Sequence, residues 1–168
     1  MNRLTSTNVD HYKAVLGRFC TGVTVVTSLY EGKPVGFTCQ SFCALSLEPP
    51  LVLLCLQKTS TTWPKIRRSG RLAINVLGEH QQAIGRRFGR TGIDRFAGVE
   101  WRPSPAGMPL LSGTLAWLEC RLTEEIDAGD HTIAVAAVDE LGTGPAQQPL
   151  LFFQGRFVGY DVKEAMSA

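Results

Sequence analysis

Apolar residues near the start of the chain repeat with a helical period. Val9, Tyr12, Leu16 and Phe19 are separated by three or four residues, so they fall on one stripe of a helix. Two later segments also have a helical composition, and the first of them is followed by the helix stop Gly70. The expected helices cover residues 8–19, 63–68 and 79–88.

Most of the remaining chain has the pattern of strands. The segments are short, rich in β-branched or other apolar residues, and bounded by turns such as residues 31–34 and 128–130. The first two strands are close enough to pair as a hairpin. Two stretches that contain closely spaced prolines are expected to be irregular, and the second is also rich in glycine. The expected strands cover residues 23–30, 35–41, 51–57, 72–77, 114–126, 132–141 and 150–157, and the expected irregular stretches cover residues 42–50 and 89–113.

These elements predict a mainly β protein with a few short flanking helices. Strands and helices do not alternate regularly, which argues against a doubly wound parallel sheet. Strands joined mainly by tight turns favour an antiparallel sheet that closes, or nearly closes, into a barrel, because closure removes exposed strand edges. The sequence contains no linker or internal repeat, so residues 1–168 are expected to form a single domain.

The composition narrows the function classes. Hydrophobic residues make up 44% of the chain and charged residues 19%, which is typical of a folded domain. The formal net charge of +2 is too small for a protein that depends on a broad phosphate-binding face, so no nucleic-acid partner is expected. The longest apolar run in the middle of the chain, residues 51–56, is too short to span a membrane, so no membrane partner is expected.

The cysteines and the N-terminus both favour a cytoplasmic protein. Five cysteines, odd in number and unevenly spaced, do not form the pattern of a disulfide framework and are expected to be reduced thiols. The first residues contain no apolar segment followed by a small-residue cleavage site.

Motifs for several common chemistries are absent from the sequence. There is no G-x-S-x-G motif, no Walker loop, and no G-x-G-x-x-G motif between a strand and a helix. His11, His80 and His131 lie far apart and no spacing typical of metal ligands occurs, so no metal site is expected. No spacing indicates a cysteine nucleophile, and free cysteine is commonly a small apolar residue without a catalytic role.

The loop from Gln57 to Thr62 has the composition of an anion site. It supplies one ammonium group and four hydroxyl groups directly before the expected helix that begins at Trp63. Free backbone N–H groups and the helix dipole at such a position favour a negatively charged ligand, a phosphate above all. The alternative is a simple Ser/Thr helix cap, which accounts for one or two of the hydroxyls.

Two further segments are candidates for ligand contacts. Residues 38–41 end a strand and carry polar groups that could bind the edge of a flat heterocycle; the alternative is an ordinary polar loop. His131 lies at the start of a strand and is the side chain there that titrates near neutral pH. The alternative is a structural or solvated turn histidine.

Seven segments, in order along nearly the whole chain, resemble the short-chain flavin reductase family. Its members are reductase components of two-component flavin-dependent monooxygenases, of the 4-hydroxyphenylacetate hydroxylase reductase type. The chain departs from the family pattern at Gln40, where many relatives have Asn, and at Gln154, where many have Arg or a similar residue. The matching segments are residues 19–27, 36–42, 46–53, 69–77, 94–99, 129–132 and 149–155.

The resemblance implies a split β-barrel related to FMN-binding folds and a homodimer. The implied activity is NADH-dependent transfer of a hydride to FAD, with FMN as the other candidate flavin. Reduced flavin would then be released to a separate monooxygenase. The choice between NADH and NADPH stays open at this point.

The family pattern also implies which residues contact each part of the ligands. Hydride transfer between two bound rings depends on positioning, so no catalytic side chain is expected, with His131 as the one candidate. The residues expected beside the flavin ring are Pro34, Val35, Gly36, Phe37, Thr38, Gln40, Ser41, Ser46 and Leu47. The residues expected along the ribityl chain and phosphate are Cys55, Leu56, Gln57, Lys58, Thr59, Ser60, Thr61 and Thr62. The residues expected on the nicotinamide side are His131, Phe152, Phe153, Gln154 and Gly155.

Two other functions fit the same barrel. A flavin carrier would bind the flavin without a site for the hydride donor. An enzyme that resembles pyridoxamine-phosphate oxidase would hold FMN tightly and act on a different substrate; the sequence has no clearly spaced arginine-rich site for a substrate phosphate, which argues against it.

Overall fold

The computed structural model describes residues 8–146 and 148–159. Its helices are α1 (Val9–Leu16), α2 (Trp63–Ser69) and α3 (Gln82–Phe88), the last preceded by a 3-10 turn, η2 (Glu79–Gln81). The strands are β1 (Thr21–Gly22), β2 (Thr24–Tyr30), β3 (Lys33–Cys39), β4 (Cys43–Leu47), β5 (Pro50–Gln57), β6 (Arg71–Val76), β7 (Trp101–Pro103), β8 (Pro109–Leu111), β9 (Ala116–Ala128), β10 (His131–Thr143), β11 (Leu151–Phe153) and β12 (Arg156–Val158).

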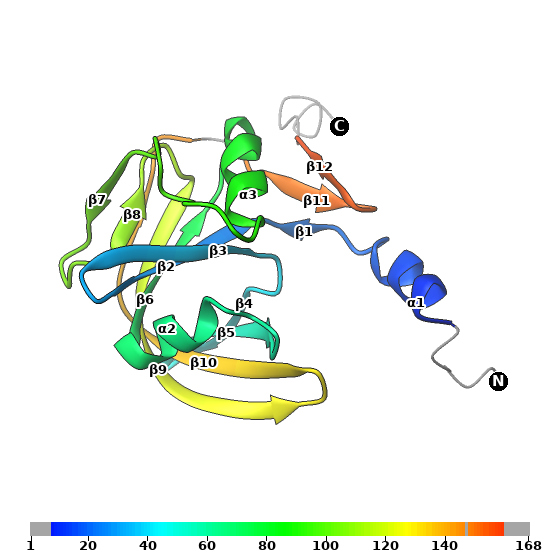
Figure 1. Cartoon of the computed structure of the whole chain (residues 1–168), viewed down its shortest axis with the longest axis horizontal. Coiled ribbons are helices and arrows are strands. Elements are labelled where there is room, and N and C mark those ends of the chain that lie inside the picture. The colour runs from blue at the N-terminus through cyan, green and yellow to red at the C-terminus, as the bar shows by residue number, and fades with distance from the viewer. Residues whose placement is uncertain (1–7, 147, 160–168) are drawn as a thin grey trace.

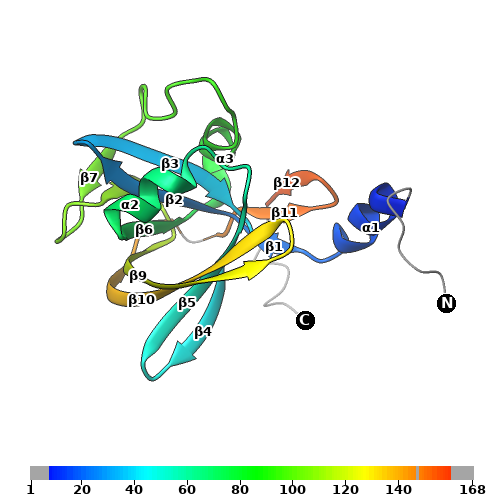
Figure 2. The same ribbon diagram turned by 60° about the horizontal axis from the view of Figure 1, so that its bottom comes forward.

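Seven strands form one strongly curled antiparallel sheet, in the order β3-β2-β6-β9-β10-β5-β4 (Figures 1 and 2). The predicted hairpin of β2 and β3 is confirmed, with Glu31 and Gly32 at positive φ in its turn. The mainly β, antiparallel character is also confirmed. Within the described residues the ladder ends at β3 and β4, so backbone hydrogen bonds do not close it into a barrel.

The concave face of the sheet holds the main core. Val26, Leu54 and Ile74 lie on three different strands and pack together with buried residues of β9 and β10. Helix α2 covers this core, because its apolar residues Trp63 and Ile66 are buried in the same cluster while its basic residues stay outside. The helix packs against β2, β3 and β6.

The opposite face of the sheet is covered as well. Val25 alternates with Val26 along β2 and packs with Leu77, Phe88 of α3 and Leu150. The small β7–β8 hairpin adds Met108 and Leu110 over Ala73 of β6, so the central strands are buried on both sides.

Three parts of the fold differ from the sequence prediction. Residues 42–50, expected to be irregular, contain β4. Pro50 begins β5 at the turn of the β4–β5 hairpin, beyond the last residue that pairs with β10, so its missing N–H breaks no central ladder. Residues 89–113 contain the β7–β8 hairpin. The single strand expected over residues 150–157 is a hairpin of β11 and β12, because Gln154 and Gly155 turn the chain with positive φ.

The first helix is shorter than predicted, and its apolar stripe is exposed. Helix α1 projects away from the sheet in both views (Figures 1 and 2). It contains no buried residue, and Val9, Tyr12, Leu16 and the nearby Phe19 are 46%, 47%, 53% and 77% exposed. The stripe that predicted the helix therefore has no partner within the described chain. None of the helices described here is long and apolar enough to cross a membrane.

Candidate functional site

A cavity of about 540 Å³ lies between the end of β3, the end of β5 and the loop before α2. The first residue of β10 completes its wall. Of the residues predicted for the site, twelve line it, and Cys39, Thr91 and Arg95 are additional. The predicted residues that line it are Phe37, Thr38, Gln40, Ser41, Cys55, Leu56, Gln57, Thr59, Ser60, Thr61, Thr62 and His131.

The free edge of β3 forms one wall. Gly36 pairs with Thr27 of β2, yet its carbonyl accepts a hydrogen bond from Arg95 on the other side. In an antiparallel ladder, the residue two positions along faces the same way, so the backbone groups of Thr38 also point to this open edge. A Cβ on Gly36 would lie 2.7 Å from the Val26 carbonyl oxygen, which explains why glycine stands here. The edge thus offers backbone groups to a ligand.

Two polar side chains next to this edge form hydrogen bonds within the protein and are therefore not free for a ligand. The Ser41 hydroxyl donates to the Cys55 carbonyl at 2.7 Å and accepts from the Cys55 N–H at 3.0 Å, which ties the end of β3 to β5. The Thr38 hydroxyl donates to the carbonyl of Gly85 in α3 at 2.6 Å. Gln40, by contrast, is exposed and makes no side-chain hydrogen bond within the described residues. Backbone edge groups and Gln40 therefore remain for a heterocycle.

The loop of residues 57–62 forms the facing wall. Ser60 acts as a cap, because its hydroxyl accepts a hydrogen bond from the Trp63 N–H at 3.1 Å. The backbone N–H groups of Thr59, Thr61 and Thr62 find no acceptor among the described residues. Three donors in one short loop suit an anion. Lys58 lies outside the cavity, since its amine pairs with Asp127 at 2.5 Å.

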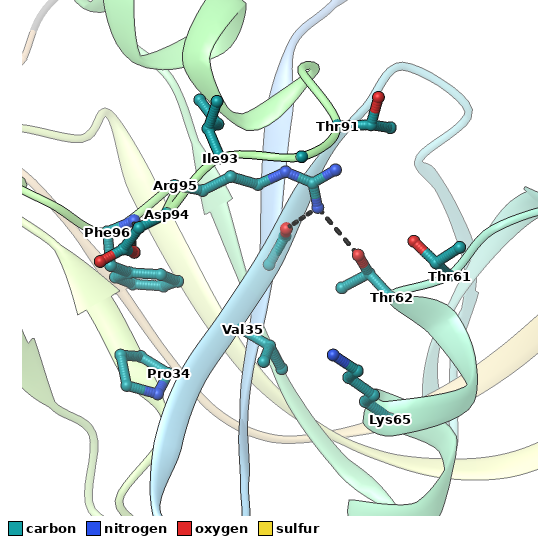
Figure 3. Close-up of a pocket in the computed structure, with 12 residues that line it drawn as sticks. Pro34, Val35, Thr61, Thr62, Lys65, Thr91, Ile93, Asp94, Arg95 and Phe96 are labelled. Atoms are coloured by element: carbon teal, nitrogen blue, oxygen red, sulfur yellow. Dashed lines mark hydrogen bonds between the residues drawn. The ribbon is translucent and has the colours of Figure 1, made fainter.

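Arg95 connects the two walls. Its Nη1 donates to the Gly36 carbonyl at 2.6 Å and to Thr62 Oγ1 at 2.8 Å (Figure 3). Its Nε donates to the Arg90 carbonyl at 2.6 Å, and burial lowers the pKa of its guanidinium. Arg87 fixes the backbone at Arg95, because its Nε donates a 3.0 Å hydrogen bond to the Arg95 carbonyl. Sequence analysis assigned Arg95 no role, although it lies in the matching segment 94–99.

A second, smaller cavity of about 240 Å³ lies beside Arg95 (Figure 3). The predicted residues Pro34, Val35 and Gly36 line this cavity and not the larger one. Its other walls come from the start of α2 and from residues 91–96. The stretch of β3 expected beside the flavin ring is therefore divided between two adjoining cavities.

His131 faces the larger cavity from the start of β10. Its Nδ1 lies 2.7 Å from Oδ1 of Asp130, and its side chain is 35% exposed. This hydrogen bond, together with the histidine's charge, lowers the pKa of the Asp130 carboxyl. The contact orients the imidazole and leaves its other nitrogen available to a ligand.

Six other predicted site residues lie away from both cavities. Ser46 and Leu47 belong to β4, and Leu47 is 95% exposed. Phe152, Phe153, Gln154 and Gly155 form the β11–β12 hairpin, where Phe152 packs edge-on against Phe157.

The described residues contain no group of three His, Cys, Asp or Glu side chains that could hold a metal ion. All five cysteines are free.

Comparison with known proteins places the chain in a family. The family model for a flavin reductase like domain matches residues 16–161. The reductase subunit HsaB of a flavin-dependent monooxygenase from Rhodococcus jostii is 48% identical over 157 residues, which cover 94% of this chain and 80% of that protein.

Solved structures agree with this match. A homolog of nitrilotriacetate monooxygenase component B from Mycobacterium thermoresistibile superposes with a TM-score of 0.91 at 45% identity, covering 95% of this chain and 90% of the other. An NADH:FAD oxidoreductase from Streptomyces globisporus, solved with NAD and FAD fragments, gives a TM-score of 0.87 at 34% identity, covering 96% and 98%. The chain belongs to the flavin reductase family, as its seven sequence segments predicted.

Proposed function

We propose that this chain is an NADH-dependent flavin reductase that reduces FAD and releases it to a separate monooxygenase. The observation that carries the proposal is the larger cavity, where the open edge of β3 faces the unpaired N–H groups of Thr59, Thr61 and Thr62, and His131 lies at the rim. Its relatives' names, reductase subunit of a flavin-dependent monooxygenase and NADH:FAD oxidoreductase, support the same activity and partner.

The donor groups in the cavity fit a flavin. The N–H groups of Thr59, Thr61 and Thr62 would bind the phosphate, because they have no acceptor among the described residues. The outward-facing backbone groups of Thr38 would meet the polar edge of the isoalloxazine ring. Lys58 is not needed for the phosphate, since Asp127 holds it outside.

The two bound ligands, NADH and the flavin, would supply the chemistry: a hydride passes from the nicotinamide of NADH to the flavin. The chain has to hold the two rings in contact and needs no side chain of strongly shifted pKa. His131, held by Asp130, would orient the nicotinamide from the rim. Because reduced flavin must leave, moderate affinity serves turnover better than tight binding.

The exposed stripe of α1 supports the homodimer that the sequence analysis expected. Val9, Tyr12, Leu16 and Phe19 present a row of apolar side chains without a partner in the described chain. A second copy would cover them. The single domain and the cytoplasmic location stay predictions.

The direct test is to mix the purified protein with NADH and FAD and follow the loss of NADH absorbance. We expect oxidation far above the rate without protein, slower rates with FMN, and lower rates with NADPH. A rate no higher than the background would overturn the proposal and leave the flavin carrier as the remaining reading. Yellow FMN that stays bound through dialysis would instead favour the enzyme that resembles pyridoxamine-phosphate oxidase.

A variant separates the reductase from the carrier. His131→Ala is expected to raise the KM for NADH severalfold while the KM for FAD stays near the wild-type value. Glu140→Ala, at an exposed position outside both cavities, serves as the control. An unchanged KM for NADH in His131→Ala would remove the nicotinamide role from this residue.

A further inference from the structure

The loop of residues 57–62 is attached near both of its ends to one structural element, the β9–β10 hairpin. Near the first end, the Lys58 N–H donates to the Asp130 carbonyl in the hairpin turn at 3.0 Å. Directly after the other end, the indole Nε1 of Trp63 donates to Oε1 of Glu125 on β9 at 2.8 Å. The hairpin, which runs beneath α2 in Figure 1, therefore fixes where the loop begins and where it ends.

Trp63 transmits the contact with Glu125 to the loop. Its ring is buried in the main core, and its backbone N–H donates to the Ser60 hydroxyl at 3.1 Å. An indole N–H can only donate, so a buried one needs an acceptor, and Glu125 supplies it. A shift of the Trp63 ring would therefore move Ser60 and the unpaired N–H groups on either side of it.

The Glu125 carboxylate is placed to hold Trp63 and not to contact a ligand. Its side chain is 25% exposed and lines neither of the two cavities, while its second oxygen lies 3.6 Å from Nη1 of Arg67 on α2. That ion pair contributes little, because the Arg67 side chain is 61% exposed and water screens its charge. The short hydrogen bond from the indole to a charged acceptor is thus the stronger of the two contacts.

We infer that Glu125 is a positioning residue for flavin binding: through the Trp63 indole it holds the loop N–H groups in the arrangement that accepts the flavin phosphate. Donors that are fixed before the ligand arrives lose less conformational freedom on binding. This role rests on the proposed function, which assigns the flavin phosphate to this loop. Loss of the carboxylate should weaken the binding of flavins that carry a phosphate and leave the binding of a flavin without one unaffected.

The first experiment compares FMN with riboflavin, which has the same ring and no phosphate, by equilibrium titration followed through flavin fluorescence. We expect Glu125→Ala to weaken FMN binding about fivefold and to leave riboflavin binding unchanged. Glu125→Gln should keep FMN binding near the wild type, because its amide oxygen can still accept from the indole. Glu124→Ala is the matched control, since Glu124 is the preceding residue of β9, is exposed and has no side-chain partner in the described chain.

A second variant tests whether the effect passes through Trp63, and it serves also where Glu125→Ala does not fold. Trp63→Phe keeps a buried ring and removes the N–H, so it should weaken FMN binding about as much as Glu125→Ala and spare riboflavin. The double variant should bind FMN no more weakly than either single variant, because all three remove the same contact. Equal weakening of FMN and riboflavin in both single variants, or no weakening of FMN in either, would overturn the inference.

Steady-state kinetics with NADH and FAD give an independent readout. Glu125→Ala is expected to raise the KM for FAD about fivefold and to keep kcat within about twofold of the wild type, because flavin that has bound still meets the nicotinamide in the same place. A fall in kcat with an unchanged KM would overturn the positioning role. A wild type that oxidises no NADH would overturn the proposed reductase, and the titration of FMN against riboflavin would still decide the role of Glu125.

Discussion

The guanidinium of Arg95 and the hydroxyl of Thr62 are joined by a 2.8 Å hydrogen bond, and the same nitrogen binds the Gly36 carbonyl at 2.6 Å. One side chain thereby connects the residue before α2 with the edge strand β3. The loop that carries it is fixed in turn by Arg87, which donates to the backbone carbonyls of Asp94 and Arg95. Arg95 therefore sets the separation of the two walls between which the ligand would lie.

Replacement of Arg95 by methionine is expected to raise the KM for flavin about tenfold and to lower the Tm by several degrees. Each lost hydrogen bond from a charged group is worth about 1.5–3 kcal/mol, and both walls lose their connection. Flavin kinetics and thermal unfolding are the measurements. The matched control is Arg90→Met, because Arg90 contacts Arg95 only through its backbone carbonyl. A variant of Arg95 with wild-type KM and Tm would refute the bridging role.

Ser41 and Gln40 are neighbours with different expected roles. Ser41→Ala is expected to lower the free energy of unfolding by about 1–3 kcal/mol, because it leaves the N–H and carbonyl of Cys55 without their partner. Gln40→Ala is expected to change the KM for flavin and leave stability near the wild type, since its exposed amide bonds to nothing described. Denaturant unfolding and flavin kinetics on both variants provide the check. If Ser41→Ala changed only the KM, the structural role given to its hydroxyl would be wrong.

Local sequence was enough to predict that residues 57–62 form a hydroxyl-rich loop before a helix and that β2 and β3 form a hairpin. Their residue types act within a few positions: hydroxyls before a helix start, and β-branched runs around a turn. Arg95 could not be found this way. Its partners, Gly36 and Thr62, lie 59 and 33 positions away in the sequence, and only the fold brings them together. The division of the site into two cavities depends on that contact.

The errors in the fold have similar physical causes. β4 reads as irregular because its burial does not alternate and prolines follow it, yet pairing with β5 makes it a strand. The residues of the β11–β12 hairpin have strand propensity on both sides of Gln154 and Gly155, and this turn lacks the Asn-Gly signal. The helical stripe of α1 predicted the helix and not its surroundings, because periodicity does not reveal whether the partner belongs to the same chain.

Gly36 is expected to tolerate no side chain. Gly36→Ala would place Cβ 2.7 Å from the Val26 carbonyl oxygen and 3.0 Å from the Phe88 ring, so β3 would have to move away from β2. Overpacking of this kind costs about 1–3 kcal/mol, and movement of the edge strand should also weaken flavin binding. Gly22→Ala is the control, because a Cβ there meets nothing within 4 Å. Chemical denaturation of both variants measures the difference, and equal stability would contradict the close packing at Gly36.

The buried thiol of Cys120 is expected to make the protein less stable at alkaline pH. Its side chain is fully buried on β9, and burial, with Asp139 and Glu119 nearby, raises the pKa of the thiol from 9.0 to about 12. The unfolded chain loses this proton near pH 9, whereas the folded protein keeps it. The unfolded state therefore gains stability from ionisation as the pH rises from 9 toward 12, and the free energy of unfolding falls over that window.

The measurement is denaturant unfolding at about pH 8 and about pH 10.5, on wild type and Cys120→Ala. The alanine variant is expected to be less stable at pH 8, because it leaves a small cavity in the core. Its further loss of stability between the two pH values should be smaller than that of the wild type, since the thiol that ionises only on unfolding is gone. Cys43→Ala, at an exposed position, should keep the wild-type dependence. Parallel losses in wild type and Cys120→Ala would mean that the Cys120 thiol contributes nothing to alkaline unfolding.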